Sequence, residues 1–335
     1  MRHTGAGCCL PWLRELALAV PAIAMATGLL AGCRNAPEVS DAARAAAVPP
    51  KAVAQQKAPE LQGRLLFHAG TGQRAALDEI AELFKARHPK VEVDFSYKGS
   101  GYFLADISAS HEGDLFMPGE AFYVEQAAKR GFVEAYDAEK HTAAYFVTVI
   151  ITPKGNPKHI TRVEDFARQG LRVGLGDPKA CAVGEWHERI FEKAGILEAV
   201  RKNTIQNAQC IPELGNATKL GAIDGTIVWM PTAALYLKDA EVIPMPAETR
   251  VAVPLPVVVL TTSKDKALAQ ALQGFILSDE GRACFRKHAY VLDLGQVDAE
   301  IEWLVRAAQV ARDPKATISE ETCGHLVEEV RRQRH

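Results

Sequence analysis

Residues 64–101 read RLLFHAGTGQRAALDEIAELFKARHPKVEVDFSYKGSG, and this stretch decides the fold class of the chain. A short apolar run leads into a turn at Gly70-Thr71-Gly72, after which apolar residues recur at helical spacing until His88-Pro89. From Val91 to Tyr97 apolar and polar residues alternate, which is typical of a half-buried strand, and a second turn follows at Gly99-Ser100-Gly101. The order strand, turn, helix, strand predicts an α/β fold with a mainly parallel sheet flanked by helices.

A second α/β series follows the first, so the sequence predicts two lobes. The apolar strand from Tyr145 to Thr152 ends the first series, and a β-rich run that begins at Val251 marks the return. Apolar residues at helical spacing beyond Gly295 predict amphipathic helices docked on the first lobe. The expected segments are 61–145 for the first part of lobe 1, 146–245 for lobe 2, 246–295 for the return to lobe 1 and 296–335 for a helical extension.

The N-terminus indicates export and a lipid anchor. Two arginines precede a short apolar run that ends in Leu30-Ala31-Gly32-Cys33, the pattern of a bacterial lipoprotein signal. We expect a signal peptide at 1–32, lipidation of Cys33 and a tether at 33–60, because the Ala- and Pro-rich segment after Cys33 has too little apolar bulk to fold. The expected location is the periplasm or cell surface, anchored in the membrane by the lipid; the alternative is a plain secretory signal.

Charge and cysteine content narrow the function classes. The formal net charge is −2 without a long basic stretch, which argues against nucleic acid as a partner. The sequence contains no CxxC or HExxH motif, so a zinc site has no support. Of the seven cysteines, two lie in the expected signal peptide and one is Cys33, so four remain; in an oxidising compartment these four predict two disulfides, in any of three connectivities. The order of the cysteines along the chain makes the simplest pairing Cys181 with Cys210 and Cys284 with Cys323.

The two glycine turns carry the chemistry of a candidate anion site. Each follows a strand and opens a helix, where unpaired N–H groups and the positive dipole end attract anions. Thr71 and Ser100 add a hydroxyl donor to each turn, although both residue types are also ordinary helix caps. Arg74 could neutralise a bound anion, or it could lie in solvent on a helix face.

The order and spacing of these motifs resemble the molybdate-binding proteins of ABC importers. The resemblance rests on His68-Ala69-Gly70-Thr71-Gly72, His88-Pro89, Gly99-Ser100-Gly101 and Gly113-Asp114-Leu115-Phe116, and it extends more loosely to Ala289. It implies the two-lobed type II periplasmic-binding-protein fold and a molybdate- or tungstate-like oxyanion held between the lobes. A membrane permease is the implied partner, and neither a cofactor nor direct side-chain ligation of a metal is expected.

The resemblance also implies the binding residues. Thr71 and Ser100 take the places of the family's two hydroxyl donors, and Val183 lies at the helix start that supplies backbone N–H groups after an Asp-Pro pair. Asn216 marks a second backbone donor of lobe 2. Trp229 stands where the family usually has a tyrosine, and its indole N–H can donate but not accept.

Other functions remain open at this stage. The same receptor could bind another oxyanion or a small organic acid, or it could act as a ligand sensor. Free thiols at Cys181 and Cys210 could hold arsenite, and Tyr145 and Tyr236 could serve an iron(III) site. An enzyme is not expected, because the sequence has no nucleophile elbow and Ser100 has no evident histidine partner.

Replacing Cys33 by serine should release the protein from the membrane without unfolding it. The residue would carry the acyl chains, and the tether after it contributes nothing to a core. Fractionation of cells that express Cys33→Ser, with immunodetection in membrane and soluble fractions, measures the effect. A variant that still sediments with membranes would contradict the lipoprotein assignment.

Overall fold

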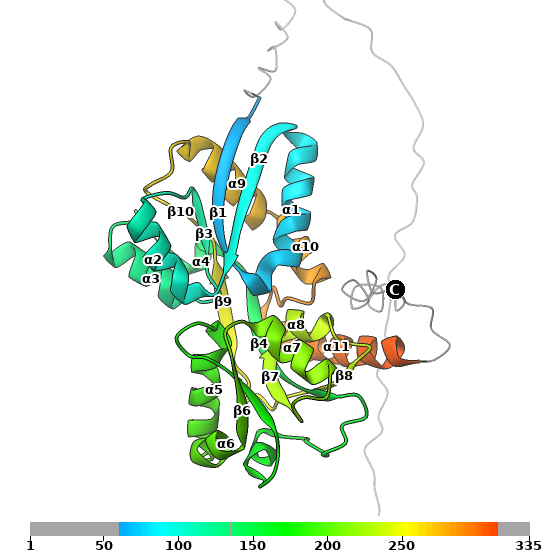
Figure 1. The fold of residues 1–335 in the computed structure, drawn as a ribbon. Helices are drawn as coiled ribbons and strands as arrows, with labels where there is room; N and C mark the ends of the chain where they lie inside the picture. The colour runs from blue at the N-terminus through cyan, green and yellow to red at the C-terminus, as the bar shows by residue number, and fades with distance from the viewer. Residues whose placement is uncertain (1–59, 135, 314–335) are drawn as a thin grey trace, which may run out of the picture. The chain divides into compact units, whose positions relative to one another are not determined.

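The computed structural model describes residues 60–134 and 136–313 (Figure 1). The expected signal peptide, Cys33, nearly all of the tether and Cys323 lie outside these residues. Within them, no helix has both the length and the apolar character needed to cross a membrane. The described chain folds into sheets flanked by helices, which confirms the predicted α/β class.

The first sheet defines lobe 1, and its strand order is β10-β3-β1-β2. Strand β1 runs parallel to β2 and β3, whereas β10 is antiparallel to β3. Helices α1 and α9 cover one face of the sheet, and α2 and α3 cover the other (Figure 1). The strands are β1 (Gln62–Gly70), β2 (Lys90–Lys98), β3 (Leu115–Met117) and β10 (Val258–Val259). The helices are α1 (Arg74–Arg87), α2 (Ser100–Ser110), α3 (Ala121–Lys129), α9 (Lys266–Leu277) and α10 (Asp279–Lys287).

The second lobe is defined by two further sheets, in which β4 pairs with β7 and β8, and β5 with β6. The β5–β6 pair is parallel, but β4 is antiparallel to both of its partners here. The expectation of a mainly parallel sheet is therefore wrong for lobe 2, because an apolar run predicts burial on both faces and not strand direction. The strands are β5 (Val173–Gly176), β6 (Thr204–Ala208), β7 (Thr226–Trp229) and β8 (Ala240–Ile243). The helices are α5 (Ala182–Lys193), α6 (Leu197–Asn203), α7 (Ile211–Lys219) and α8 (Met230–Ala234).

Two long segments connect the lobes. After the short helix α4 (Ala138–His141), strand β4 (Thr142–Pro153) pairs with β9 (Ala252–Pro256) in its first half and with the lobe 2 strands in its second half. At the change of partner, Thr148 N–H donates to the Val251 carbonyl at 3.0 Å, and Val251 N–H donates to Thr148 Oγ1 at 2.9 Å. The two crossings are thus tied to each other; lobe boundaries at residues 145 and 245 remain predictions.

The helix α11 (Val297–Arg312) follows the turn η4 (Leu294–Gln296) and lies beside α8 and β8 (Figure 1). Arg312 fixes its end, since the guanidinium donates to the Ala240 carbonyl at 2.8 Å and pairs with Glu241 at 2.7 Å. The expectation that this helix docks on lobe 1 is wrong. Its apolar stripe predicted burial but could not choose between two apolar surfaces.

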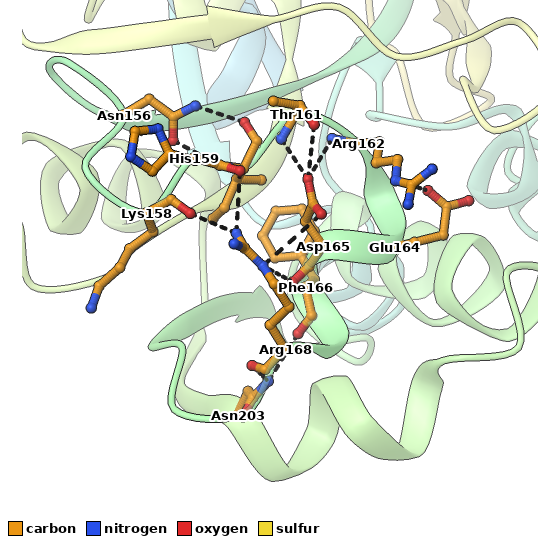
Figure 2. Close-up of polar contacts among 11 residues, drawn as sticks. Asn156, Lys158, His159, Thr161, Arg162, Glu164, Asp165, Phe166, Arg168 and Asn203 are labelled. Atoms are coloured by element: carbon orange, nitrogen blue, oxygen red, sulfur yellow. Dashed lines mark hydrogen bonds and ion pairs between the residues drawn. The ribbon is translucent and has the colours of Figure 1, made fainter.

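A network of hydrogen bonds fixes the loop that enters lobe 2 (Figure 2). One Asp165 carboxylate oxygen, in the short helix η3 (Val163–Ala167), accepts from the N–H groups of Thr161 and Arg162 at 2.7 and 3.2 Å. Arg168 donates to the Lys158 carbonyl at 2.6 Å. These bonds satisfy the backbone of a loop that has no strand partner.

The imidazole of His187 joins three elements inside lobe 2. From α5, its Nδ1 accepts from the Gly176 N–H of β5 at 3.0 Å, and its Nε2 faces the Ile227 carbonyl of β7 at 2.7 Å. Only the neutral ring with its hydrogen on Nε2 satisfies both partners. Burial accordingly lowers the pKa of His187 from 6.5 to about 4.

We predict that the free energy of unfolding falls as the pH is lowered from 6.5 to 4. Over this range His187 takes up a proton in the unfolded state but stays neutral in the folded state. This difference lowers the free energy of unfolding by roughly 3 kcal/mol. Urea unfolding at several pH values measures the slope for the parent and for His187→Gln, whose side chain does not titrate. Equal slopes in the two proteins would show that His187 is not the responsible group.

Candidate functional site

A small pocket lies where the two glycine turns of lobe 1 face the N-termini of α5 and α7 of lobe 2. Its cavity volume is about 20 Å³. Of the residues predicted to bind a ligand, Thr71, Ser100 and Trp229 line this pocket, whereas Val183 and Asn216 do not. The tertiary structure thus brings together three residues that lie far apart in the sequence.

The first turn contributes Thr71 and a residue that the sequence reasoning missed, Gln73. Both belong to the short helix η2 (Thr71–Gln73), which follows β1 directly. Gln73 is fully buried, and its Nε2 donates to the Pro118 carbonyl at 2.9 Å, while its Oε1 finds no partner in the described part of the chain. The signal was present in the sequence, since an amide so close to a glycine turn is a ready hydrogen-bonding group.

The second turn contributes Ser100, which is 2% exposed. Its hydroxyl oxygen accepts from the Gly119 N–H at 2.9 Å, which leaves its own hydrogen available to a ligand. Ser100 is the first residue of α2, whose cap is Gly99, and its side chain makes no capping hydrogen bond. The alternative role as an ordinary helix cap therefore does not describe this serine.

Trp229 forms the inner wall of the pocket. Its ring is fully buried and stacks on Phe146 with centroids 5.1 Å apart and planes inclined by 6°. The indole Nε1 has no hydrogen-bond partner among the described residues. A buried donor without a partner costs free energy, so this nitrogen is a position where a bound acceptor would be stabilised.

Lobe 2 presents two helix N-termini to the pocket. Cys181 and Ala182 at the start of α5, and Cys210 and Ile211 at the start of α7, belong to its lining. Helix α5 starts at Ala182, in the segment after Asp177-Pro178 where the resemblance places backbone donors. Both helix starts carry N–H groups and positive dipole ends, which attract anions.

Val183 and Asn216 take other positions. Val183 is buried one residue beyond the pocket lining. Asn216 lies within α7, where its Oδ1 accepts from the Tyr236 hydroxyl at 3.0 Å. Neither residue lines the pocket, and their assignment as backbone donors to a ligand stays a prediction.

The predicted pairing of Cys181 with Cys210 is absent, since both are free thiols in this structure, as is Cys284. Chain order shows which thiols are neighbours in the sequence, but a bond also needs a specific geometry between the two β-carbons. Burial raises the pKa of Cys181 to about 12, so this wall of the pocket is neutral. The second expected pairing involves Cys323 and lies outside the described residues.

The two lobes approach each other backbone to backbone at the second glycine turn. A β-carbon added to Gly99 would lie 2.1 Å from the Ala180 carbonyl oxygen, and one added to Gly101 would lie 2.5 Å from that of Lys179. Neither glycine has a positive φ, so contact between the lobes and not backbone conformation excludes a side chain here. The structure therefore represents a closed conformation.

Charged side chains contribute little to the pocket. Lys98 is the charged residue of its described lining, and its ammonium pairs with Asp106. The guanidinium of Arg74 lies over the ring of Tyr97 at 4.4 Å and is not part of the lining. Among residues 60–134 and 136–313, no group of three or more His, Cys, Asp or Glu is placed to hold a metal ion. The pocket offers neutral hydrogen-bond donors.

Comparison with known proteins places these features in a family. The sequence pattern of the family described as bacterial extracellular solute-binding protein matches residues 65–291. A binding protein of Haemophilus influenzae is 27% identical over 230 residues, which cover 68% of this chain and 90% of that protein. The molybdate-binding protein ModA of Mycobacterium tuberculosis is 24% identical over 218 residues, which cover 65% of this chain and 80% of that protein.

Solved structures share the fold. The sulfate-binding protein SubI of Mycobacterium tuberculosis superposes with a TM-score of 0.64 at 17% identity, over 72% of this chain and 92% of that one. The periplasmic molybdate-binding protein of Azotobacter vinelandii gives a TM-score of 0.57 at 19% identity, over 68% and 99%. These similarities confirm the periplasmic-binding-protein fold.

We expect Gly101→Ala to keep the lobes apart, because the added methyl group would collide with the Lys179 carbonyl. Cys181 is 4% exposed when the lobes touch, and it should then react several-fold faster with an alkylating reagent. Peptide mass spectrometry measures the rate of this alkylation. The matched control is Gly274→Ala, since a β-carbon at that helical glycine meets no atom within 4 Å. Unchanged alkylation of Cys181 in Gly101→Ala would contradict the assigned contact.

Proposed function

The chain belongs to the bacterial extracellular solute-binding proteins, a family of non-enzymatic receptors of ABC transporters, and from this premise we propose that it binds a tetrahedral oxyanion of the molybdate or tungstate kind. The ligand would occupy the pocket lined by Thr71, Ser100 and Trp229. Delivery to a membrane permease would follow when the lobes open.

The unpartnered indole nitrogen of Trp229 is the observation that carries the proposal. It lies fully buried in the wall of a pocket that also receives the Ser100 hydroxyl, whose oxygen is already engaged by Gly119. Two side chains that line one small pocket and can each donate a hydrogen bond suit an acceptor with several oxygens. A desolvated dianion meets that need, provided that nearly every oxygen finds a donor.

Size and charge support the same class of ligand. The small cavity volume, about 20 Å³, favours a compact ligand in the closed conformation. The N-termini of α5 and α7 add N–H groups and positive dipole ends without a mobile counter-ion. Neutral donors of fixed geometry bind a dianion without competing proton equilibria of their own.

Sulfate is the second candidate. It is a dianion of the same tetrahedral form, and the sulfate-binding protein of Mycobacterium tuberculosis shares the fold with this chain. Trp229 stands where the resemblance places a tyrosine, and its bulkier ring forms part of the pocket wall. A thermal-shift screen of the exported chain with molybdate, tungstate, sulfate, phosphate, arsenite and iron(III) distinguishes these ligands.

The receptor role also indicates where the protein is located. We infer that the folded part is held at the outer face of a membrane through Cys33, with residues 34–60 as the tether. The formal net charge of −2 does not favour nucleic acid as a partner. The cargo anion is the ligand, so neither a resident cofactor nor side-chain ligation of a metal enters the proposal.

Ser100→Ala should lower the affinity for the best oxyanion of the screen by about 10- to 150-fold. The bound anion would lose one charge-assisted hydrogen bond, worth roughly 1.5–3 kcal/mol. Titration calorimetry measures the affinity, and Thr71→Ala tests the other turn in the same way. A loss at only one of the two positions would restrict the binding site to that turn.

Ser108→Ala is the matched control, because this serine lies on the same helix and donates to the Leu104 carbonyl away from the pocket. It should bind like the parent. If Ser100→Ala binds as tightly as the parent but melts several degrees lower without ligand, the hydroxyl serves the Gly119 N–H and not the anion.

A further inference from the structure

A buried carboxyl group of lobe 1 is hydrogen-bonded to a side chain of lobe 2. Glu120 precedes α3 and is 5% exposed. Its Oε2 accepts from the indole Nε1 of Trp186, which belongs to α5, at 3.2 Å. Its other oxygen, Oε1, is buried without a partner among the described residues. An ionised carboxylate with one free oxygen in such a place is costly.

The surroundings of Glu120 do not compensate a negative charge. From α5, Glu185 and Arg189 face it, and these two are paired with each other while Arg189 also lies over the Trp186 ring at 4.8 Å. From its own helix α3 the Tyr123 hydroxyl faces it. Burial, reinforced by the charge of Glu185, raises the pKa of Glu120 from 4.5 to about 7 in this conformation.

Glu120 is also linked to the pocket through the chain. Its neighbour Gly119 donates its N–H to Ser100 Oγ at 2.9 Å and lines the pocket. A β-carbon at Gly119 would lie 3.0 Å from that of Ala182 at the start of α5, so this segment of lobe 1 lies directly against lobe 2. The carboxyl and the Ser100 hydroxyl are therefore positioned by the same short segment.

We propose that Glu120 is a positioning residue that takes up a proton when the lobes close, so that ligand binding is coupled to protonation. In the closed conformation the neutral carboxyl accepts from Trp186 and avoids a buried charge. When the lobes separate, Trp186 leaves with lobe 2 and the carboxyl meets water, where it is ionised at neutral pH. The proposal rests on the receptor role and concerns the closure of the same site.

The sign of the coupling follows from the two conformations. Below pH 4.5 the carboxyl is protonated in both conformations, so closure takes up no proton. Between 4.5 and about 7 only the closed form holds the proton, so affinity falls as the pH rises. Above about 7 both forms are ionised, and affinity reaches a lower plateau. The proton acts as a second ligand of the closed state.

The test compares the parent with Glu120→Gln, whose amide oxygen can still accept from Trp186 but does not titrate. Calorimetric affinity for the oxyanion that binds best is measured at pH 5.5, 6.5, 7.5 and 8.5. From 5.5 to 7.5 the parent should lose roughly 20-fold more affinity than the variant, and little more above 7.5. Titration of the anion itself affects both proteins equally and cancels in the comparison.

Glu125→Gln is the control, since Glu125 is an exposed carboxylate on the same helix, and it should keep the profile of the parent. Parallel profiles for the parent and Glu120→Gln would overturn the proposal. Should Glu120→Gln fail to fold, carboxyl ¹³C titration of Glu120 in the liganded parent gives the answer, and a pKa near 4.5 contradicts the coupling. Absence of oxyanion binding at every pH in all proteins would instead contradict the proposed function.

Discussion

Backbone contact between the lobes at Gly99 and Gly101 is the constraint on which the rest of the site depends. A carbonyl oxygen of lobe 2 lies where a β-carbon of either residue would be, so a side chain at either position would force the lobes apart. Only at this separation do the N-termini of α5 and α7 face the Ser100 hydroxyl across one small pocket. The glycines that the sequence analysis assigned to anion approach thus serve closure as well.

Closure places polar groups in a space that excludes most water, and a hydrogen bond in such a space is electrostatically stronger than one in water. Within residues 60–134 and 136–313, the Trp229 indole nitrogen and Gln73 Oε1 are buried without partners, while the Ser100 hydroxyl keeps its hydrogen available. Such groups are costly in an empty pocket and favourable around a ligand that satisfies them. Under the proposed function, a ligand that satisfies these groups would favour the closed conformation, and opening of the lobes would favour its release.

The same burial affects carboxyl and thiol groups near the pocket. Glu120 and Cys181 both have raised pKa values because their charged forms are desolvated, so both groups are neutral at low pH. Glu120 differs from Cys181 in that its hydrogen-bond partner comes from the opposite lobe. Desolvation of this one carboxyl therefore changes with the conformation, and the proton equilibrium changes with it.

The sequence by itself determined the α/β class and the two glycine turns, because strand and helix periodicity and the conformational needs of tight turns are local properties. It also placed Thr71 and Ser100 after two neighbouring parallel strands of lobe 1, and the resemblance added Trp229, the last residue of β7 in lobe 2; all three line the pocket. Strand direction in lobe 2, the docking of α11 and the state of the thiols were decided by tertiary structure, since apolar patterns specify burial but not the partner.

The residues near the pocket that sequence reasoning missed are also those whose surroundings depend on tertiary packing. Gln73 and Glu120 are polar residues beside glycines and look like exposed turn residues in the sequence. Their burial depends on Pro118 in one case and on Trp186 of the other lobe in the second. A pocket between two lobes is built from segments distant in the chain, and their mutual orientation follows from packing, which no local pattern encodes.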